Sequence, residues 1–110
     1  MSDREQKAFA ELVAVCRRLR GPDGCPWDRE QTYATLRDYL IEECYEVVDA
    51  LDRDDRQGLC EELGDLLFQV AFLSLLLEED GHGDLEAVIR AVHDKLVARH
   101  PHVFGEAEAR

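Results

Sequence analysis

The chain has 110 residues, and its 25 acidic residues outnumber its 13 basic residues, which gives a formal net charge of −12. This length suits one domain, so we treat residues 1–110 as a single domain, and 45% hydrophobic residues are too many for a chain that is disordered by composition. The acidity argues against non-specific nucleic-acid binding and against docking on anionic lipid, because both need a basic face. Residues 29–80 hold 15 of the acids and only 4 bases.

Two features favour a cytoplasmic protein that does not enter a membrane. The amino-terminal residues lack the basic-then-apolar pattern of a secretory signal. The longest apolar stretch, residues 66–77, is interrupted by Gln69 and Ser74 and is too short to span a bilayer.

The four cysteines, at positions 16, 25, 44 and 60, include no Cys-x-x-Cys pair. We therefore expect reduced cysteines that serve packing.

The first two predicted elements are helices. Ser2 with Glu5 fits a capping box, and the helix that follows should end near Arg20, before the Gly- and Pro-rich turn at residues 21–26. Asp28 with Gln31 fits a second amino-terminal cap, which predicts a helix that runs to about residue 53.

Two further helices complete the predicted fold. Asp54 and Asp55 should open a third helix over about 56–79, which Gly81 ends. Asp84 should cap a fourth helix, which ends at His100 because the following proline disfavours helical backbone in the residue before it. No segment shows the strict alternation of a half-buried strand. The sequence therefore predicts an all-α, four-helix-bundle-like domain.

The third predicted helix also bears on assembly. Its residues 66–77 are apolar around nearly the whole circumference, so the helix must be covered on more than one side. Because four short helices leave most members with an exposed face, we expect a second copy of the chain to supply the cover. The prediction is a homodimer at least.

The second predicted helix carries two carboxylates on its apolar side. Leu36, Leu40 and Val47 define an apolar seam, and Glu43 occupies a position on that seam where a core residue is expected. Glu46 follows three residues later and shares nearly the same side.

The third predicted helix repeats this arrangement. Its expected inward stripe consists of Leu59, Leu63, Leu66 and Val70. Glu62 flanks that stripe and Asp65 follows three residues later. Since a short connection makes the two helices antiparallel neighbours, the two carboxylate pairs should face each other.

Inward carboxylates are costly unless they are paired, protonated or bound to a cation. The nearby bases Arg37, Arg53 and Arg56 are too few to neutralise four converging acids. A hard divalent cation would do so, because Mg²⁺ and Mn²⁺ prefer oxygen ligands. The alternatives are an ordinary solvated acidic face, and a di-iron carboxylate bundle, which usually has Glu-x-x-His pairs that are absent here.

Three separated blocks carry a resemblance to a known family. Glu42-Glu43-x-x-Glu46 followed by Glu62-x-x-Asp65 is similar to the signature of all-α nucleoside triphosphate pyrophosphohydrolases. Gly24-Cys25-Pro26-Trp27-Asp28-x-x-Gln31-Thr32 resembles the amino-terminal motif of the MazG type, and Lys95-Leu96-x-x-Arg99-His100-Pro101-His102-Val103-Phe104 resembles its closing motif. The blocks cover roughly residues 20–105 in the order found in that family.

The resemblance implies Mg²⁺-dependent hydrolysis of a nucleoside triphosphate to the monophosphate and pyrophosphate, as in nucleotide pool house-cleaning, with Mn²⁺ as a possible substitute. Carried over by motif position, the metal ligands would be Glu43, Glu46, Glu62 and Asp65. Glu42 would bind a further ion or orient the attacking water. The family forms dimers or higher oligomers, which agrees with the two-sided third helix.

Three more residues are candidates for substrate contacts. Lys95 and Arg99, one helical turn apart, could contact phosphate or only solubilise the surface. Trp27, the single tryptophan, could line the nucleotide pocket or only fasten its loop, and Tyr39 could touch the ligand or an interface. The closing motif departs from the family at Ala98, where a second arginine is common. The alternative function is a non-catalytic dimerisation or nucleotide-binding module, or one copy of a longer tandem protein.

Overall fold

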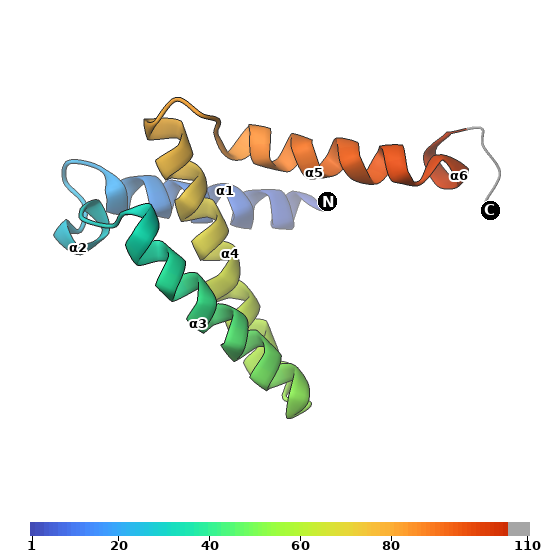
Figure 1. Cartoon of the computed structure of the whole chain (residues 1–110), viewed down its shortest axis with the longest axis horizontal. Helices are drawn as coiled ribbons and strands as arrows, with labels where there is room; N and C mark the ends of the chain where they lie inside the picture. Colours follow the sequence, from blue (N-terminus) through green and yellow to red (C-terminus); the bar gives the residue numbers. More distant parts are fainter. Residues whose placement is uncertain (106–110) are drawn as a thin grey trace.

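The computed structural model describes residues 1–105, which form six α-helices and no strand. The helices are α1 (Asp3–Arg20), α2 (Pro26–Arg29), α3 (Tyr33–Asp52), α4 (Arg56–Glu79), α5 (Leu85–Arg99) and α6 (Pro101–Phe104). In Figure 1, α3 and α4 form a long antiparallel pair, α1 crosses α4 near its carboxyl end, and α5 leads away from that end. The all-α prediction is confirmed, with two one-turn helices added to the four long ones. The last five residues of the predicted domain 1–110 lie outside the described part.

Local capping fixes three of the predicted helix starts. Ser2 Oγ accepts from the backbone N–H of Glu5 at 3.1 Å, and Glu5 Oε1 accepts from the N–H of Ser2 at 2.8 Å, which completes the predicted capping box. Asp55 caps α4 and Asp84 caps α5, each through a carboxylate oxygen that accepts a backbone N–H three residues later. After α4, Gly81 has a φ of 73°, a conformation that glycine adopts at little cost.

The predicted cap of the second long helix is wrong. Asp28 lies inside α2, because Pro26 starts a helical turn at a position where its missing N–H costs nothing. Thr32 caps α3 instead, and its hydroxyl accepts from the N–H of Thr35 at 3.3 Å. Gln31 uses its side-chain amide to donate to the Trp27 carbonyl oxygen at 3.0 Å.

The core lies in the carboxyl-terminal half of α4, where α1 and α3 both pack. Its buried residues are Cys16, Leu36, Ala71, Phe72, Leu75 and Leu76. The predicted inward stripe of α4 is therefore partly wrong, since Leu63 is 49% exposed and Val70 is 39% exposed. The amino-terminal half of α4 has α3 as its partner, so within residues 1–105 its other sides stay uncovered.

The cysteines are free thiols, as expected, but their packing role holds only in part. Cys16 is fully buried in the core, whereas Cys44 and Cys60 are exposed, which corrects the prediction for those two. Among the helices of residues 1–105, none combines the length and apolarity that a membrane crossing needs.

The helix α5 stands apart from the α3–α4 pair. In the described chain it contacts only α4 and α6, and Figure 1 shows it running away from both long helices. Ile89, Val92 and Leu96 are each 44–50% exposed along it. Four long helices are thus present, but an apolar side of α5 finds no cover in the part of the chain that the structure describes.

Candidate metal and substrate site

Three acidic side chains converge between α3 and α4. Glu43 lies on α3, and Glu62 and Asp65 lie one turn apart on α4. One carboxylate oxygen from each lies within 4.8 Å of the other two. The antiparallel pairing of the two helices brings together three of the four carboxylates that the sequence pattern predicted to converge. We call Glu43, Glu62 and Asp65 the acidic triad.

Charge in the triad is poorly compensated. Burial raises the pKa of Glu43 above its ordinary value, and the negative charges of Asp65, Glu62 and Glu46 raise it further. Its Oε2 atom is buried and finds no hydrogen-bond partner within residues 1–105. The bases nearest in sequence pair with other acids, in the pairs Arg37–Asp38, Arg53–Asp49 and Arg56–Asp54. A group of oxygen ligands without a resident positive charge is what a hard divalent cation prefers.

The other two acids predicted for this site lie beside the triad. Glu46 is exposed on α3, one turn beyond Glu43, and its charge still acts on Glu43. Its oxygens are not among those grouped within 4.8 Å. Glu42 is exposed on the adjacent position of α3. Glu46 therefore lies near the triad, whereas Glu42 is placed only by its position next to Glu43 in the sequence of α3.

A cavity of about 190 Å³ lies next to the triad, between α2, α3 and α4. Trp27 and Tyr39, both considered for ligand contact, line it together with Phe68 and Phe72. Trp27 is 61% exposed, so most of its indole is open to solvent. Two glutamines that sequence reasoning did not assign to a site, Gln31 and Gln69, also line this cavity.

Arg20 holds the segment that carries Trp27 and Gln31. Its Nη1 donates to the backbone carbonyl oxygens of Asp28, Arg29 and Gln31 at 2.7, 3.0 and 2.9 Å. The guanidinium also forms a two-bond ion pair with Glu79, and it lies 5.8 Å from the centre of the Phe72 ring. One partly buried arginine thus ties α1, the α2 segment and α4 together.

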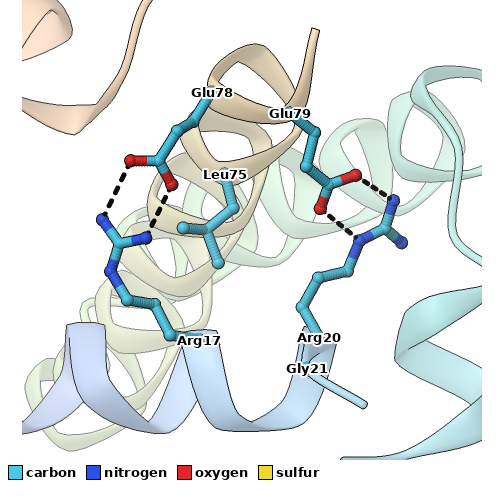
Figure 2. Close-up of a pocket in the computed structure, with 6 residues that line it drawn as sticks. All are labelled: Arg17, Arg20, Gly21, Leu75, Glu78 and Glu79. Atoms are coloured by element: carbon cyan, nitrogen blue, oxygen red, sulfur yellow. Dashed lines mark hydrogen bonds and ion pairs between the residues drawn. The ribbon is translucent and has the colours of Figure 1, made fainter.

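The cleft in Figure 2 is a structural joint between α1 and α4. Arg17 pairs with Glu78 at 2.6 Å and Arg20 pairs with Glu79 at 2.8 Å, on either side of Leu75. The bond from Arg20 lowers the pKa of Glu79 and raises that of Arg20. Since each cation already has its anion, this cleft has little to offer a charged ligand.

The structure does not bring the two predicted phosphate contacts to the triad of the same chain. Lys95 and Arg99 are exposed near the carboxyl end of α5. Because α5 contacts only α4 and α6 in the described residues, its far end lies away from the α3–α4 groove (Figure 1). A contact with substrate at the triad would need α5 of another copy.

Comparison with known proteins decides the family. The model of the MazG nucleotide pyrophosphohydrolase domain matches residues 31–104, which is more than half of the chain. The chain belongs to the MazG family. The matched segment contains the acidic triad, Glu42, Glu46, Lys95 and Arg99.

Several MazG relatives share about half of their aligned residues with this chain. The MazG nucleoside triphosphate pyrophosphohydrolase/pyrophosphatase of Thermotoga maritima is 50% identical over 99 residues, which are 90% of this chain and 39% of that protein. The nucleoside triphosphate pyrophosphohydrolase of Escherichia coli is 50% identical over 99 residues, 89% of this chain and 38% of that protein. This chain thus spans about two fifths of the length of these relatives.

A solved structure supports the MazG fold. The crystal structure of a mazG-related protein from Thermotoga maritima superposes with a TM-score of 0.76 at 31% identity. The match covers 92% of this chain and 87% of that one. The helical arrangement is therefore shared along nearly the whole chain.

Sequence reasoning missed three residues of the site for identifiable reasons. Gln31 was assigned to a helix cap, and Arg20 was counted only as the end of α1. Gln69 was noted as a break in an apolar stretch. A polar residue in the middle of a buried helix is the signal that points to Gln69, because such a group needs a partner.

Proposed function

We propose that this MazG domain hydrolyses nucleoside triphosphates to the monophosphate and pyrophosphate with the help of Mg²⁺, for which Mn²⁺ can substitute. The observation that carries the proposal is the acidic triad, whose three carboxylates lie within 4.8 Å of one another without a basic partner in the described residues. Relatives at 50% identity carry the name nucleoside triphosphate pyrophosphohydrolase, which supports the reaction.

The residues fit a divalent cation. Glu43, Glu62 and Asp65 offer oxygen ligands from two helices, and Glu46, whose charge acts on Glu43, is the proposed fourth ligand. The buried Glu43 oxygen without a partner gains one when a cation binds. A bound cation would polarise the phosphoryl oxygens and lower the pKa of an attacking water.

The remaining chemistry falls to side chains beside the triad. A carboxylate must take the proton of the attacking water, and Glu42 and Glu46 are exposed where water reaches them. The raised pKa of Glu43 means that a proton competes with the metal for this side chain as the pH falls. Metal binding should therefore weaken as the pH falls.

The substrate phosphates need positive charge beyond the metal, and the proposal assigns this role to Lys95 and Arg99 of a second copy. Their helix does not contact α3 within one chain. Exposed apolar residues on α4 and α5, among them Leu63, Leu67, Val92 and Leu96, support a homodimer in which α5 of one copy approaches the groove of the other.

Product analysis tests the proposed reaction. Purified protein is incubated with each ribo- and deoxyribonucleoside triphosphate and Mg²⁺ or Mn²⁺, and the products are separated by anion exchange. Monophosphate and pyrophosphate support the proposal. Diphosphate and orthophosphate would contradict the bond that is cleaved, and no product from any nucleotide would favour a binding module instead.

Two substitutions test the residues. Glu46→Gln and Asp65→Asn should lower turnover at least a hundredfold while the dimer persists in light scattering, because each removes a proposed metal ligand. Glu61→Gln is a matched control, since Glu61 is an exposed acid on α4 next to the triad. Wild-type activity in both ligand variants would refute the assignment.

A further inference from the structure

The cavity beside the triad has the walls of a binding site for a flat ring. It measures about 190 Å³, somewhat more than the roughly 150 Å³ of a cavity known to admit benzene. Trp27, Tyr39 and Phe68 supply aromatic surface around it. Aromatic side chains stack on any nucleobase, because every base has a flat aromatic face whatever polar groups lie on its edge.

Its polar lining includes two buried amide oxygens that have no hydrogen-bond partner in the described residues. Gln31 and Gln69 are only 8% and 9% exposed, and the Oε1 atom of each is buried without a partner in residues 1–105. The Nε2 of Gln31 donates to the Trp27 carbonyl, which fixes the amide so that its oxygen is the free atom. Asp28 adds a carboxylate to the lining. This set repels phosphate and suits a group that donates N–H bonds.

The cavity lies about one helical turn from the triad, a separation that suits the base and the phosphates of one nucleotide. Tyr39 precedes Glu43 by four residues on α3, and Gln69 follows Asp65 by four residues on α4. Four residues of helix rise about 6 Å, so the cavity and the triad are neighbouring stretches of one groove. A single nucleotide has its base and its phosphates on either side of a sugar and could occupy both stretches.

We propose that this cavity binds the nucleobase of the triphosphate, and that Gln31 and Gln69 select bases with an exocyclic amino group by accepting its hydrogen bonds. The proposal rests on the proposed function for the placement of the phosphates at the triad. Cytosine, adenine and guanine carry such a donor, whereas uracil and thymine present a carbonyl oxygen at the corresponding position of the pyrimidine ring. A buried acceptor left facing another acceptor costs free energy.

The comparison of CTP with UTP tests the selection, since cytosine carries an amino donor at C4 where uracil carries a carbonyl oxygen, and N3 changes from an acceptor in cytosine to an N–H donor in uracil. We expect kcat/KM for CTP to exceed that for UTP by about tenfold, the effect of one buried hydrogen bond. Gln69→Met removes the acceptor at nearly constant volume and should bring the CTP and UTP values to within about twofold of each other, because CTP loses a hydrogen bond and UTP loses the opposed oxygen. Gln57→Met, an exposed glutamine on the same helix, is the matched control and should change neither value.

A binding measurement separates this proposal from the reaction. Trp27 is the only tryptophan, so its fluorescence reports directly on the cavity. Titration with non-hydrolysable analogues of CTP and UTP in Mg²⁺ should give tighter binding of the cytosine nucleotide even if the hydrolysis products turn out differently. Equal affinity of wild-type protein for the two analogues would overturn the base selection and leave the proposed hydrolysis standing. An equal loss for both nucleotides in a folded Gln69→Met variant would show a merely structural role for Gln69 and overturn its assignment.

Discussion

Glu43→Gln should stabilise the metal-free protein while it removes the metal site. Glu43 lies within 4.8 Å of Glu62 and of Asp65, and burial together with these charges raises its pKa. Coulomb's law gives about 1 kcal/mol per pair at this distance in a water-like medium and about 3 kcal/mol at an effective dielectric constant near 20. Because side chains rotate apart in the absence of metal, we expect a net gain of about 1 kcal/mol for the variant.

Thermal unfolding in EDTA at fixed protein concentration measures this gain. About 1 kcal/mol corresponds to a rise in Tm of roughly 4 °C for a domain of this size. Added Mg²⁺ should raise the Tm of the wild type and leave that of Glu43→Gln nearly unchanged, because the cation binds only the folded triad. Glu61→Gln removes the same charge outside the triad and should change the Tm by less than 1 °C in either condition.

The difference in stability between the wild type and Glu43→Gln should depend on pH. The pKa of Glu43 is raised in the folded state above its ordinary value of 4.5, so the folded state binds the proton more tightly than the unfolded state. The contribution of Glu43 to the stability of the metal-free wild type should fall as pH rises from 4.5 through the raised pKa, and the advantage of Glu43→Gln should shrink toward zero near pH 4.5. A variant that is less stable than wild type in EDTA at pH 7, or that gains the same Tm from Mg²⁺, would refute this reasoning.

Two further substitutions test other parts of the account. Arg20→Lys should destabilise the protein by about 2 to 3 kcal/mol in denaturant unfolding, because an ammonium cannot bond three carbonyl oxygens and form a two-bond ion pair at once. Arg17→Lys is the control, since its ion pair is about half exposed, and it should cost less than 1 kcal/mol. Similar losses in the two variants would contradict the role given to Arg20. Arg99→Ala should raise the KM for nucleotide about tenfold. Mixing the Arg99→Ala and Asp65→Asn variants should recover about a quarter of wild-type activity, because half of the dimers are then mixed and each mixed dimer has one intact site. No recovery would show that Arg99 does not act across the dimer.

The helices and the acidic pairs were predictable because they follow from local patterns. Capping residues such as Ser2 and Asp84 act on backbone three residues away, so they fix helix starts without knowledge of the rest of the fold. The spacing of Glu62 and Asp65 places them on one side of any helix, and the short connection to α3 brings that side to Glu43.

The tertiary details were less predictable because they depend on which segments meet. The assumed stripe on α4 failed at Leu63, which lies in the half that α1 does not cover, and at Val70, because Ala71 and Leu75 are the residues that pack on Cys16 of α1. The cap at Asp28 failed because Pro26 nucleates a separate turn. The role of Arg20 follows from carbonyls up to eleven residues away and a partner 59 residues away, and no local pattern encodes such a contact.

The central claim is that the acidic triad binds the cation on which hydrolysis depends. Titrating metal-free protein with Mn²⁺, with bound metal followed by electron paramagnetic resonance and monophosphate release followed in the same samples, tests it most directly. The account predicts that the rate of release rises in step with bound Mn²⁺ in the wild type, and that Asp65→Asn loses both. Hydrolysis that proceeds at full rate without metal, or an Asp65→Asn variant that binds Mn²⁺ and turns over like the wild type, would contradict it.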